Sequence, residues 1–331
     1  MKERIRRWLS HAGYVGFPLF YLLCLVVFAA VTFPFRLLRD RIVATFNAQQ
    51  RAGGGSYELQ VDDFRGSWLT GVRMKGVRLL SAPTDAGKAL KTLEIDDATL
   101  RYGILAALTG SREVTFDVFA FGGEATGAYA TQGKDVSVDV SLDSIELGRV
   151  TPLVDLVGVP LKGRLSGTMH LLLPDGAMSK AAGTVSMSAK DVSVGDGKAK
   201  LKGQLALPTI DVGPVSFVSE AKGGVLKVSK LLAGGKDLEL QGDGRVLLRD
   251  PVTDAICDVQ IRFKINDAYR GKNDMTSTLF GEPGSTAAPL FELADPRIKQ
   301  AKRPDGFYGW TMRGALGRAD FVPAGGSAGK P

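Results

Sequence analysis

The stretch GVPLKGRLSGTMHLLLP, residues Gly158–Pro174, decides the fold. Its odd-numbered positions are aliphatic residues or glycine, and its even-numbered positions from 162 to 170 are all polar or charged. Strict alternation with a period of two predicts a half-buried β-strand that has one apolar face. The run is about three times the usual strand length of about five to six residues. Gly163 and Gly167 fall on the apolar face, which indicates that this long strand bends.

The same alternation returns in many runs between residues 53 and 322, which we interpret as one β-rich domain. Glycine and aspartate residues typical of turns separate the runs, as in GDGK at 195–198 and GDGR at 242–245. Long helical patterns do not alternate with these runs, so we expect about a dozen strands, mostly antiparallel. The sequence therefore predicts a mainly β fold with only a few short helices.

One face of these strands is predicted to be apolar, and it forms either a closed core or an open groove. The residues assigned to this face are Val136, Val138, Val140, Val159, Leu161, Leu165, Met169, Leu171, Leu201, Leu205, Val259, Ile261 and Phe263. Cys257 shares the face of Val259 and is interpreted as a core residue. The apolar phase changes at Gly76, which predicts a β-bulge. Gly163 and Gly167 are expected to leave room where a curved sheet crowds its concave face.

The N-terminal region predicts a membrane anchor. Residues 12–35 contain no charged residue and are long enough for a spanning helix, which needs about 20 apolar residues. A cleaved signal peptide is the weaker alternative, because its apolar region runs about 7–15 residues. The basic flank at residues 1–11 places the N-terminus in the cytoplasm and everything after the span outside it. Residues 36–52 are predicted to form a connector helix, and residues 323–331 a flexible tail.

The charge distribution argues against nucleic acid as a partner. The chain of 331 residues has a formal charge of +7, but residues 1–51 alone carry eight basic and two acidic residues. The body is therefore almost neutral, and it lacks interleaved basic and aromatic residues. The two cysteines, one in the predicted span and one in the body, are not expected to form a disulfide.

Motifs for catalysis or cofactor binding are missing from the sequence. With two histidines, it has no HExxH site and no plausible Ser-His-Asp set, and it has no Walker A or GxGxxG pattern. Glu94, Asp96 and Asp97 are interpreted as a solvated strand rather than a metal or acid–base site. Phe307, Tyr308 and Trp310 are interpreted as core residues rather than a binding platform. We therefore expect no enzyme activity, no cofactor and no metal.

Several blocks carry a resemblance to a known family. SWLTGVRMKGVRLL (67–80), TLEIDDATLRYGILAALTG (92–110) and VTFDVFAFGGEATGAY (114–129) resemble the opening of AsmA-like envelope proteins, and 154–174 resembles their recurring GxPLxGxLxG strand. The order of these blocks behind one N-terminal span resembles the type II secretion system protein N (GspN) family. The resemblance implies an elongated, strongly bent antiparallel sheet with an apolar groove. It also implies a single-pass inner-membrane protein with its body in the periplasm.

Two functions follow as hypotheses. The first is a non-enzymatic scaffold or accessory subunit of a type II secretion system, in which sheet edges or the C-terminal block bind other subunits. The second is an AsmA-like lipid-binding or lipid-transfer protein that uses the apolar face as a groove. The partners expected are the inner-membrane bilayer, other type II secretion subunits, and phospholipid in the groove.

Overall fold

The computed structural model describes residues 17, 20, 21, 24, 25, 27, 28, 32–52, 57–67, 70–81, 91–103, 106, 110–151, 153–154, 158–198, 200–201, 205–206, 208–285 and 287–325. In this part of the chain, no helix is both long and apolar enough to cross a membrane. Much of the predicted span at residues 12–35 lies outside the described residues, and the anchor therefore stays a prediction.

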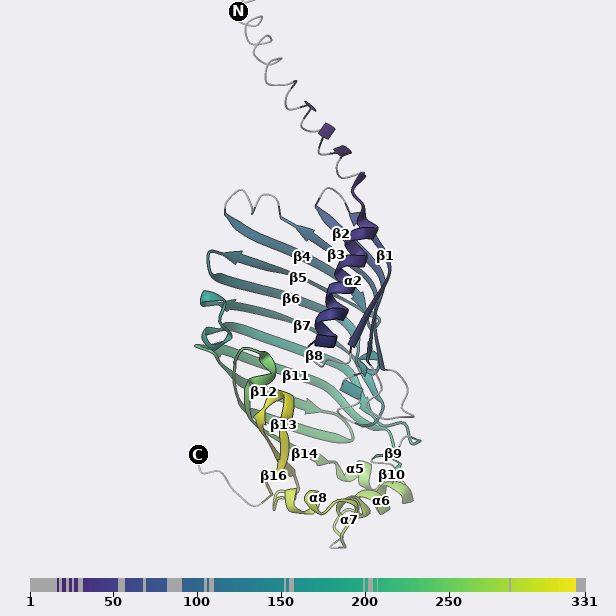
Figure 1. Ribbon diagram of the computed structural model, residues 1–331. Coiled ribbons are helices and arrows are strands. Elements are labelled where there is room, and N and C mark those ends of the chain that lie inside the picture. Colours follow the sequence, from purple (N-terminus) through teal and green to yellow (C-terminus); the bar gives the residue numbers. More distant parts are fainter. Residues whose placement is uncertain are drawn as a thin grey trace, which may run out of the picture.

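One open, curved antiparallel sheet of 14 strands makes up most of the protein (Figure 1). The order of the strands in the sheet follows the chain, except that β8 lies beside β11. The strands are β1 (Tyr57–Ser67), β2 (Gly71–Ser81), β3 (Lys91–Tyr102), β4 (Ser111–Ala120), β5 (Gly123–Gln132), β6 (Asp135–Glu146), β7 (Leu161–Leu173), β8 (Ala182–Val194), β11 (Ile210–Lys222), β12 (Val225–Gly234), β13 (Leu238–Leu247), β14 (Ile256–Ile265), β15 (Tyr308–Ala315) and β16 (Asp320–Pro323). The fold is therefore mainly β, as the alternation predicts.

Leu201 and Leu205 lie outside this sheet, and their assignment to the apolar groove or core face stays a prediction. They lie in β9 (Lys200–Leu201) and β10 (Leu205–Ala206), which pair with each other as a separate two-stranded sheet. The alternation around them is genuine, but Pro208 follows at once and has no backbone N–H to continue a ladder. The side chains of these two leucines lie outside the described residues.

Cross-strand pairing gathers the other apolar positions on one face, which we call the inner face. Val140 pairs with Met169, and Val138 pairs with Leu171. Met169 pairs in turn with Val185 on β8. Because opposed residues in an antiparallel pair point to the same side, the apolar residues of successive strands form continuous rows across the sheet. The outer face carries the alternate, mostly polar residues.

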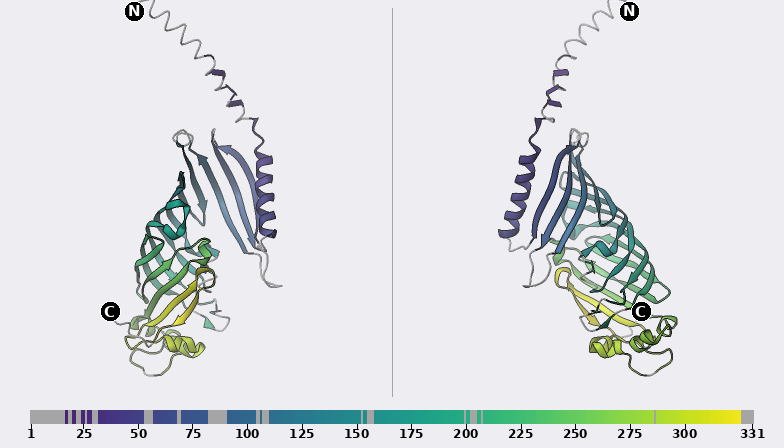
Figure 2. Two further views of the ribbon diagram at one scale, coloured as in Figure 1. Left: turned by 60° about the vertical axis from the view of Figure 1, so that its left-hand side comes forward. Right: turned by 90° about the vertical axis from the view of Figure 1, so that its right-hand side faces the viewer.

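The sheet is curved (Figure 2), and two glycines of β7 allow for a register shift and for a close neighbouring side chain. Gly163 has φ +131°, and the register between β7 and β8 shifts between Lys162 and Arg164. Gly167 pairs regularly, but a Cβ there would lie 2.5 Å from Sδ of Met187. Gly163 thus allows an unusual backbone conformation, whereas Gly167 makes room for a neighbouring side chain on the inner face.

Gly76 changes the apolar phase of β2 without the extra residue of a bulge. It has φ +59°, and the pairing of β1 with β2 resumes on both sides of it in the same register. The register shift lies one strand further on, between Ile95 and Asp97 of β3 where it pairs with β4. The predicted phase change is therefore present, but the irregular pairing falls on β3.

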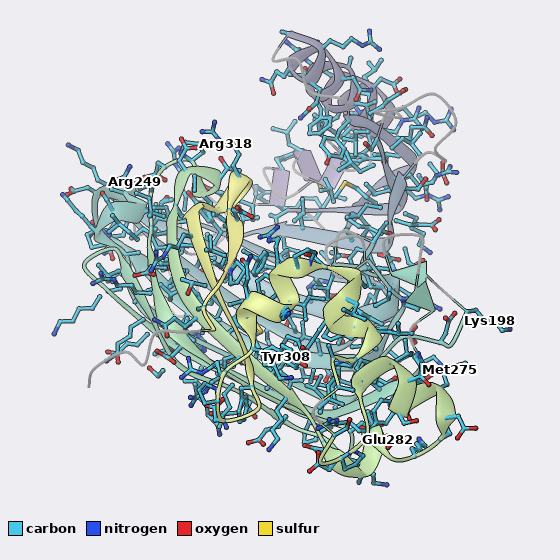
Figure 3. All side chains as sticks on the ribbon, turned by 90° about the horizontal axis from the view of Figure 1, so that it is seen from below. Lys198, Arg249, Met275, Glu282, Tyr308 and Arg318 are labelled. Carbon is cyan, nitrogen blue, oxygen red and sulfur yellow. The ribbon has the colours of Figure 1, made fainter. Side chains whose placement is uncertain are left out.

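Helices cover the two ends of the sheet. Helix α2 (Phe35–Ala52) packs along β1, over the segment predicted to be a connector helix. Four short helices lie near β14–β16, and we call them the C-terminal helical block (Figure 3). They are α5 (Asp267–Arg270), α6 (Asp274–Phe280), α7 (Leu290–Ala294) and α8 (Pro296–Ala301). Short 3₁₀ turns occupy 147–149, 174–176, 178–180, 252–254 and 316–318.

Candidate functional site

The inner face is closed near the C-terminal helical block. Val159 packs with Ile210 and Ile265 of the sheet and with Tyr269, Leu279 and Phe280 of the block. A second buried cluster adjoins it, made of Leu147, Leu161, Ala189, Val192, Val212 and Ala233. Val259 and Cys257 are buried nearby on β14, and burial raises the pKa of the Cys257 thiol. This part of the inner face is therefore an ordinary hydrophobic core.

Further from the block, much of the same face is only half-buried. Val138, Val140, Met169, Leu171 and Val185 all keep part of their side-chain surface accessible. Tyr129 on β5 is more open still, because 45% of it is exposed. A closed sandwich would bury such residues almost completely. The inner face between β2 and β8 is therefore an apolar surface that the described residues leave partly uncovered.

The remaining predicted residues divide between these two regions. Val136, Ile261 and Phe263 are half-buried, and Leu165 packs against the second buried cluster. Phe263 stacks on Tyr308, with ring centroids 5.5 Å apart. The sequence thus places these residues on one face, but it does not separate the closed part from the open part.

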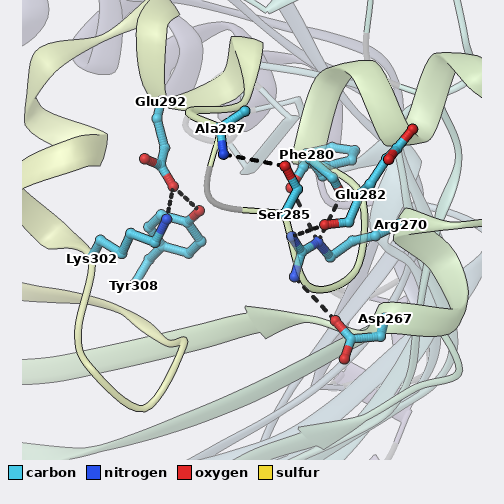
Figure 4. Close-up of polar contacts among 10 residues, drawn as sticks. Asp267, Arg270, Phe280, Glu282, Ser285, Ala287, Glu292, Lys302 and Tyr308 are labelled. Atoms are coloured by element: carbon cyan, nitrogen blue, oxygen red, sulfur yellow. Dashed lines mark hydrogen bonds and ion pairs between the residues drawn. The ribbon is translucent and has the colours of Figure 1, made fainter.

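A buried polar cluster joins the helical block to β15 (Figure 4). The carboxylate of Glu292, 3% exposed, accepts hydrogen bonds from Lys302 Nζ (2.6 Å) and from the Tyr308 hydroxyl (2.8 Å). Burial, together with the neighbouring Glu292 carboxylate, raises the pKa of the Tyr308 phenol. Tyr308 is therefore a core residue, as predicted for this aromatic segment, and its hydroxyl donates a hydrogen bond to the helical block.

Arg270 joins α5 to the end of α6 (Figure 4). Its guanidinium donates hydrogen bonds to the backbone carbonyls of Phe280 (3.1 Å), Gly281 (3.0 Å) and Glu282 (3.0 Å), and to the carboxylate of Asp267 (3.0 Å). Four acceptors fix this planar group in one orientation. These hydrogen bonds therefore hold α5 and the end of α6 in a defined arrangement.

The acidic residues of β3 form a solvated, ion-paired surface. Glu94 and Asp96 are exposed, and Asp97 accepts hydrogen bonds from the Arg73 guanidinium (2.6 Å to the nearest nitrogen). That bond holds the pKa of the Asp97 carboxyl below its usual value. Within the described residues, no group of three His, Cys, Asp or Glu is placed to hold a metal ion. His170 lies on the outer face, with Nδ1 2.7 Å from Asp139 Oδ1.

A cleft where α2 begins was not found by sequence reasoning. It has a volume of about 730 Å³ and lies between the start of α2 and the end of β1. Its lining combines aromatic rings, arginines and two aspartates: Phe33, Pro34, Phe35, Arg36, Arg39, Asp62, Asp63, Phe64, Arg65 and Gly66. The signal available in the sequence was the group of arginines that follows the predicted span.

Comparison with known proteins identifies no relative of this chain. No protein-family model, no curated protein and no solved structure matches the chain. The likeness to AsmA-like and GspN proteins therefore rests on the sequence blocks quoted above.

Proposed function

We propose that this protein is an AsmA-like lipid-binding protein of the cell envelope, in which the inner face acts as a groove for phospholipid acyl chains. The observation that carries this proposal is the half-buried state of Val138, Val140, Met169 and Leu171, on a continuous apolar face without a covering layer of described residues. Covering apolar surface contributes about 25 cal/mol per Å². An acyl chain is a suitable cover, since it needs no hydrogen-bonding partner.

The shape of the sheet suits a chain that extends away from a membrane. Fourteen strands spaced by about 4.8 Å make a sheet roughly 60 Å long, and its open part from β2 to β8 spans roughly 30 Å, about the hydrocarbon thickness of a bilayer. We place the predicted anchor in the inner membrane and the sheet in the periplasm. The C-terminal helical block closes the far end of the groove, so lipid enters from the end near α2.

The proposal is binding or transfer rather than catalysis. Val138, Val140, Met169 and Leu171 carry no side chain that could act as an acid, a base or a nucleophile toward a bound lipid. His170 and the paired aspartates lie on the outer face, away from the groove. A lipid bound here is therefore held and moved without being changed.

Lipid content of the purified protein tests this proposal. The full chain is extracted from membranes in a mild detergent, and phospholipid is quantified per chain before and after extensive washing. We expect about one or more phospholipids retained by the wild type, and fewer in a Val138→Asp, Val140→Asp variant. The control is the outer-face variant Ser137→Asp, Ser141→Asp. Equal lipid content in all three proteins contradicts the proposal.

A second candidate function is the accessory role in type II secretion, and one observation favours it. The outer face carries an apolar row on three neighbouring strands, where Val225 pairs with Leu247 and Leu247 with Ile256. These side chains are 36–39% exposed, and Leu316 nearby is 46% exposed. Such a row is suited to a protein partner. An Ile256→Glu variant that blocks secretion of folded proteins, with unchanged lipid content, would favour this second function.

A further inference from the structure

The cleft at the start of α2 is chemically different from the groove. Its lining includes two phenylalanines, Phe35 and Phe64, and three arginines, Arg36, Arg39 and Arg65. Phe64 is 6% exposed and pairs with Met74 on the inner face. The cleft therefore adjoins the first row of the groove at the end from which the N-terminal segment leaves (Figure 1).

The charges in the cleft leave one arginine uncompensated. Arg65 pairs with Asp63 (2.8 Å), Arg39 pairs with Asp40 (2.8 Å), and Arg78 pairs with Asp62. Arg36 lines the same cleft, is exposed, and has no ion-pair partner among the described residues. The cleft and its paired neighbours thus carry a net charge of about +1, which one phosphodiester monoanion neutralises.

We propose that this cleft binds the phosphate of an anionic phospholipid whose acyl chains lie on the adjoining inner face. This proposal rests on the lipid-binding function proposed above and adds the headgroup class and the end of the groove that receives it. Arg36 supplies the uncompensated charge, and Arg39 is held in place by Asp40 and by the Asp62 backbone carbonyl (3.5 Å). The ring of Phe35 lies against Gly66, where a Cβ would be 2.5 Å from Cζ, and forms the apolar wall between phosphate and acyl chains.

The position of the cleft, next to the predicted membrane span, fits the binding of an anionic phospholipid. Arg36 directly follows the predicted span, so the cleft lies at the level of lipid headgroups if that span is inserted. Basic groups at that level attract anionic lipids. Arg51, in the last turn of the same helix, lies outside the cleft and carries the same charge, which makes it a matched control.

Native mass spectrometry of the full chain in a non-ionic detergent tests the site. Phosphatidylglycerol and phosphatidylcholine of the same chain length are added separately, and the fraction of protein carrying one lipid is measured. We expect wild type to prefer phosphatidylglycerol, and Arg36→Glu to reduce that preference about fivefold or more. Arg51→Glu keeps the wild-type preference. Equal preference in wild type and Arg36→Glu overturns the proposed site.

Two further measurements separate the site from the groove and from soluble phosphate esters. Val140→Asp is expected to reduce the binding of both lipids alike, so loss of groove binding and loss of headgroup preference are distinguishable. Glycerol 3-phosphate at a hundredfold excess over lipid is expected to leave the bound lipid in place. If it displaces phosphatidylglycerol, the site binds a free phosphate ester and the assignment to lipid is wrong.

Discussion

Asn47 of α2 forms two hydrogen bonds with the backbone of Leu59 on the edge strand β1. The backbone N–H of Leu59 donates to Asn47 Oδ1 (2.8 Å), and Asn47 Nδ2 donates to the Leu59 carbonyl (3.3 Å). The side-chain amide thus occupies the positions that another strand would use. At the opposite edge, Arg297 of α8 donates to the backbone carbonyl of Phe321 on β16. Each edge strand thus has a helix side chain bonded to its backbone at one residue, which argues against strand addition at these two positions.

Removal of this edge contact is expected to expose β1. Asn47→Ala leaves the N–H and carbonyl of Leu59 without these partners, so we expect the free energy of unfolding to fall by about 1–2 kcal/mol. We also expect concentration-dependent self-association, measured by analytical ultracentrifugation in detergent. Gln49→Ala is the control, because Gln49 is an exposed residue of the same helix. If Asn47→Ala matches the wild type in both measurements, the helix does not protect the edge.

The buried carboxylate of Glu292 is expected to hold the helical block on β15. Glu292→Ala leaves the Tyr308 hydroxyl and Lys302 Nζ without their acceptor, and we expect a loss of about 1–3 kcal/mol in the free energy of unfolding. Urea unfolding followed by tryptophan fluorescence measures this change. Glu282→Ala serves as the control, since the Glu282 backbone carbonyl, and not its carboxylate, is bound by Arg270. Equal midpoints for the two variants would show that the cluster adds no stability.

Two residues of β7 are expected to respond differently to the same substitution. Leu165 packs against the buried cluster that includes Leu147 and Leu161, so Leu165→Asp brings an unpaired charge next to a core. We expect it to lower the free energy of unfolding by about 3 kcal/mol. Met169 lies on the open part of the same face, and Met169→Asp is expected to cost less than about 1 kcal/mol while reducing lipid binding. The opposite order of stabilities would mean that the open and closed regions are wrongly assigned.

The buried phenol of Tyr269 is expected to make the folded protein less stable at alkaline pH. Burial raises the pKa of its phenol to about 12, and its hydroxyl donates to the Thr209 carbonyl (3.0 Å). Because the pKa is higher in the folded state than the unfolded value of about 10, the stabilisation is complete below pH of about 10 and declines above it. We expect a loss of roughly 2–3 kcal/mol between pH of about 10 and about 12.

The substitution Tyr269→Phe checks this assignment. It removes the hydrogen bond, so the variant is less stable at neutral pH, but it also removes the ionisation. Urea unfolding at several pH values is therefore expected to show a shallower decline for the variant than for the wild type. Tyr308, whose pKa is also raised, supplies the decline that remains. Parallel curves for both proteins would contradict the role of Tyr269.

Much of the sheet is predictable from the sequence because its signal is local. Alternation in residues 158–174 places Leu161, Leu165, Met169 and Leu171 on one face, and pairing in the structure keeps them there. Local alternation does not reveal which strands pair with each other, and it does not indicate that Leu201 and Leu205 lie in a separate two-stranded sheet. It also does not separate open from closed parts of the face, since burial depends on what packs across it.

The helical block and the cleft are harder to predict. Helices α5 to α8 have four to seven residues, which is too short for a period of 3.6 to become visible. The burial of Glu292 depends on contacts with Lys302 and Tyr308, which are 10 and 16 residues away in sequence. The cleft forms because β1 packs alongside α2, and a local sequence pattern does not reveal this contact between two segments.

Site-specific photo-crosslinking in cells tests the central claim most directly. A photoreactive residue is placed at Val140 on the inner face or at the adjacent Ser141 on the outer face, and the adducts are analysed by mass spectrometry. The two residues are neighbours on β6, so the crosslinkers differ mainly in the face of the sheet to which they point. We predict phospholipid adducts at position 140 and few at position 141. Adducts confined to the protein chain at both positions would contradict an open lipid-binding groove.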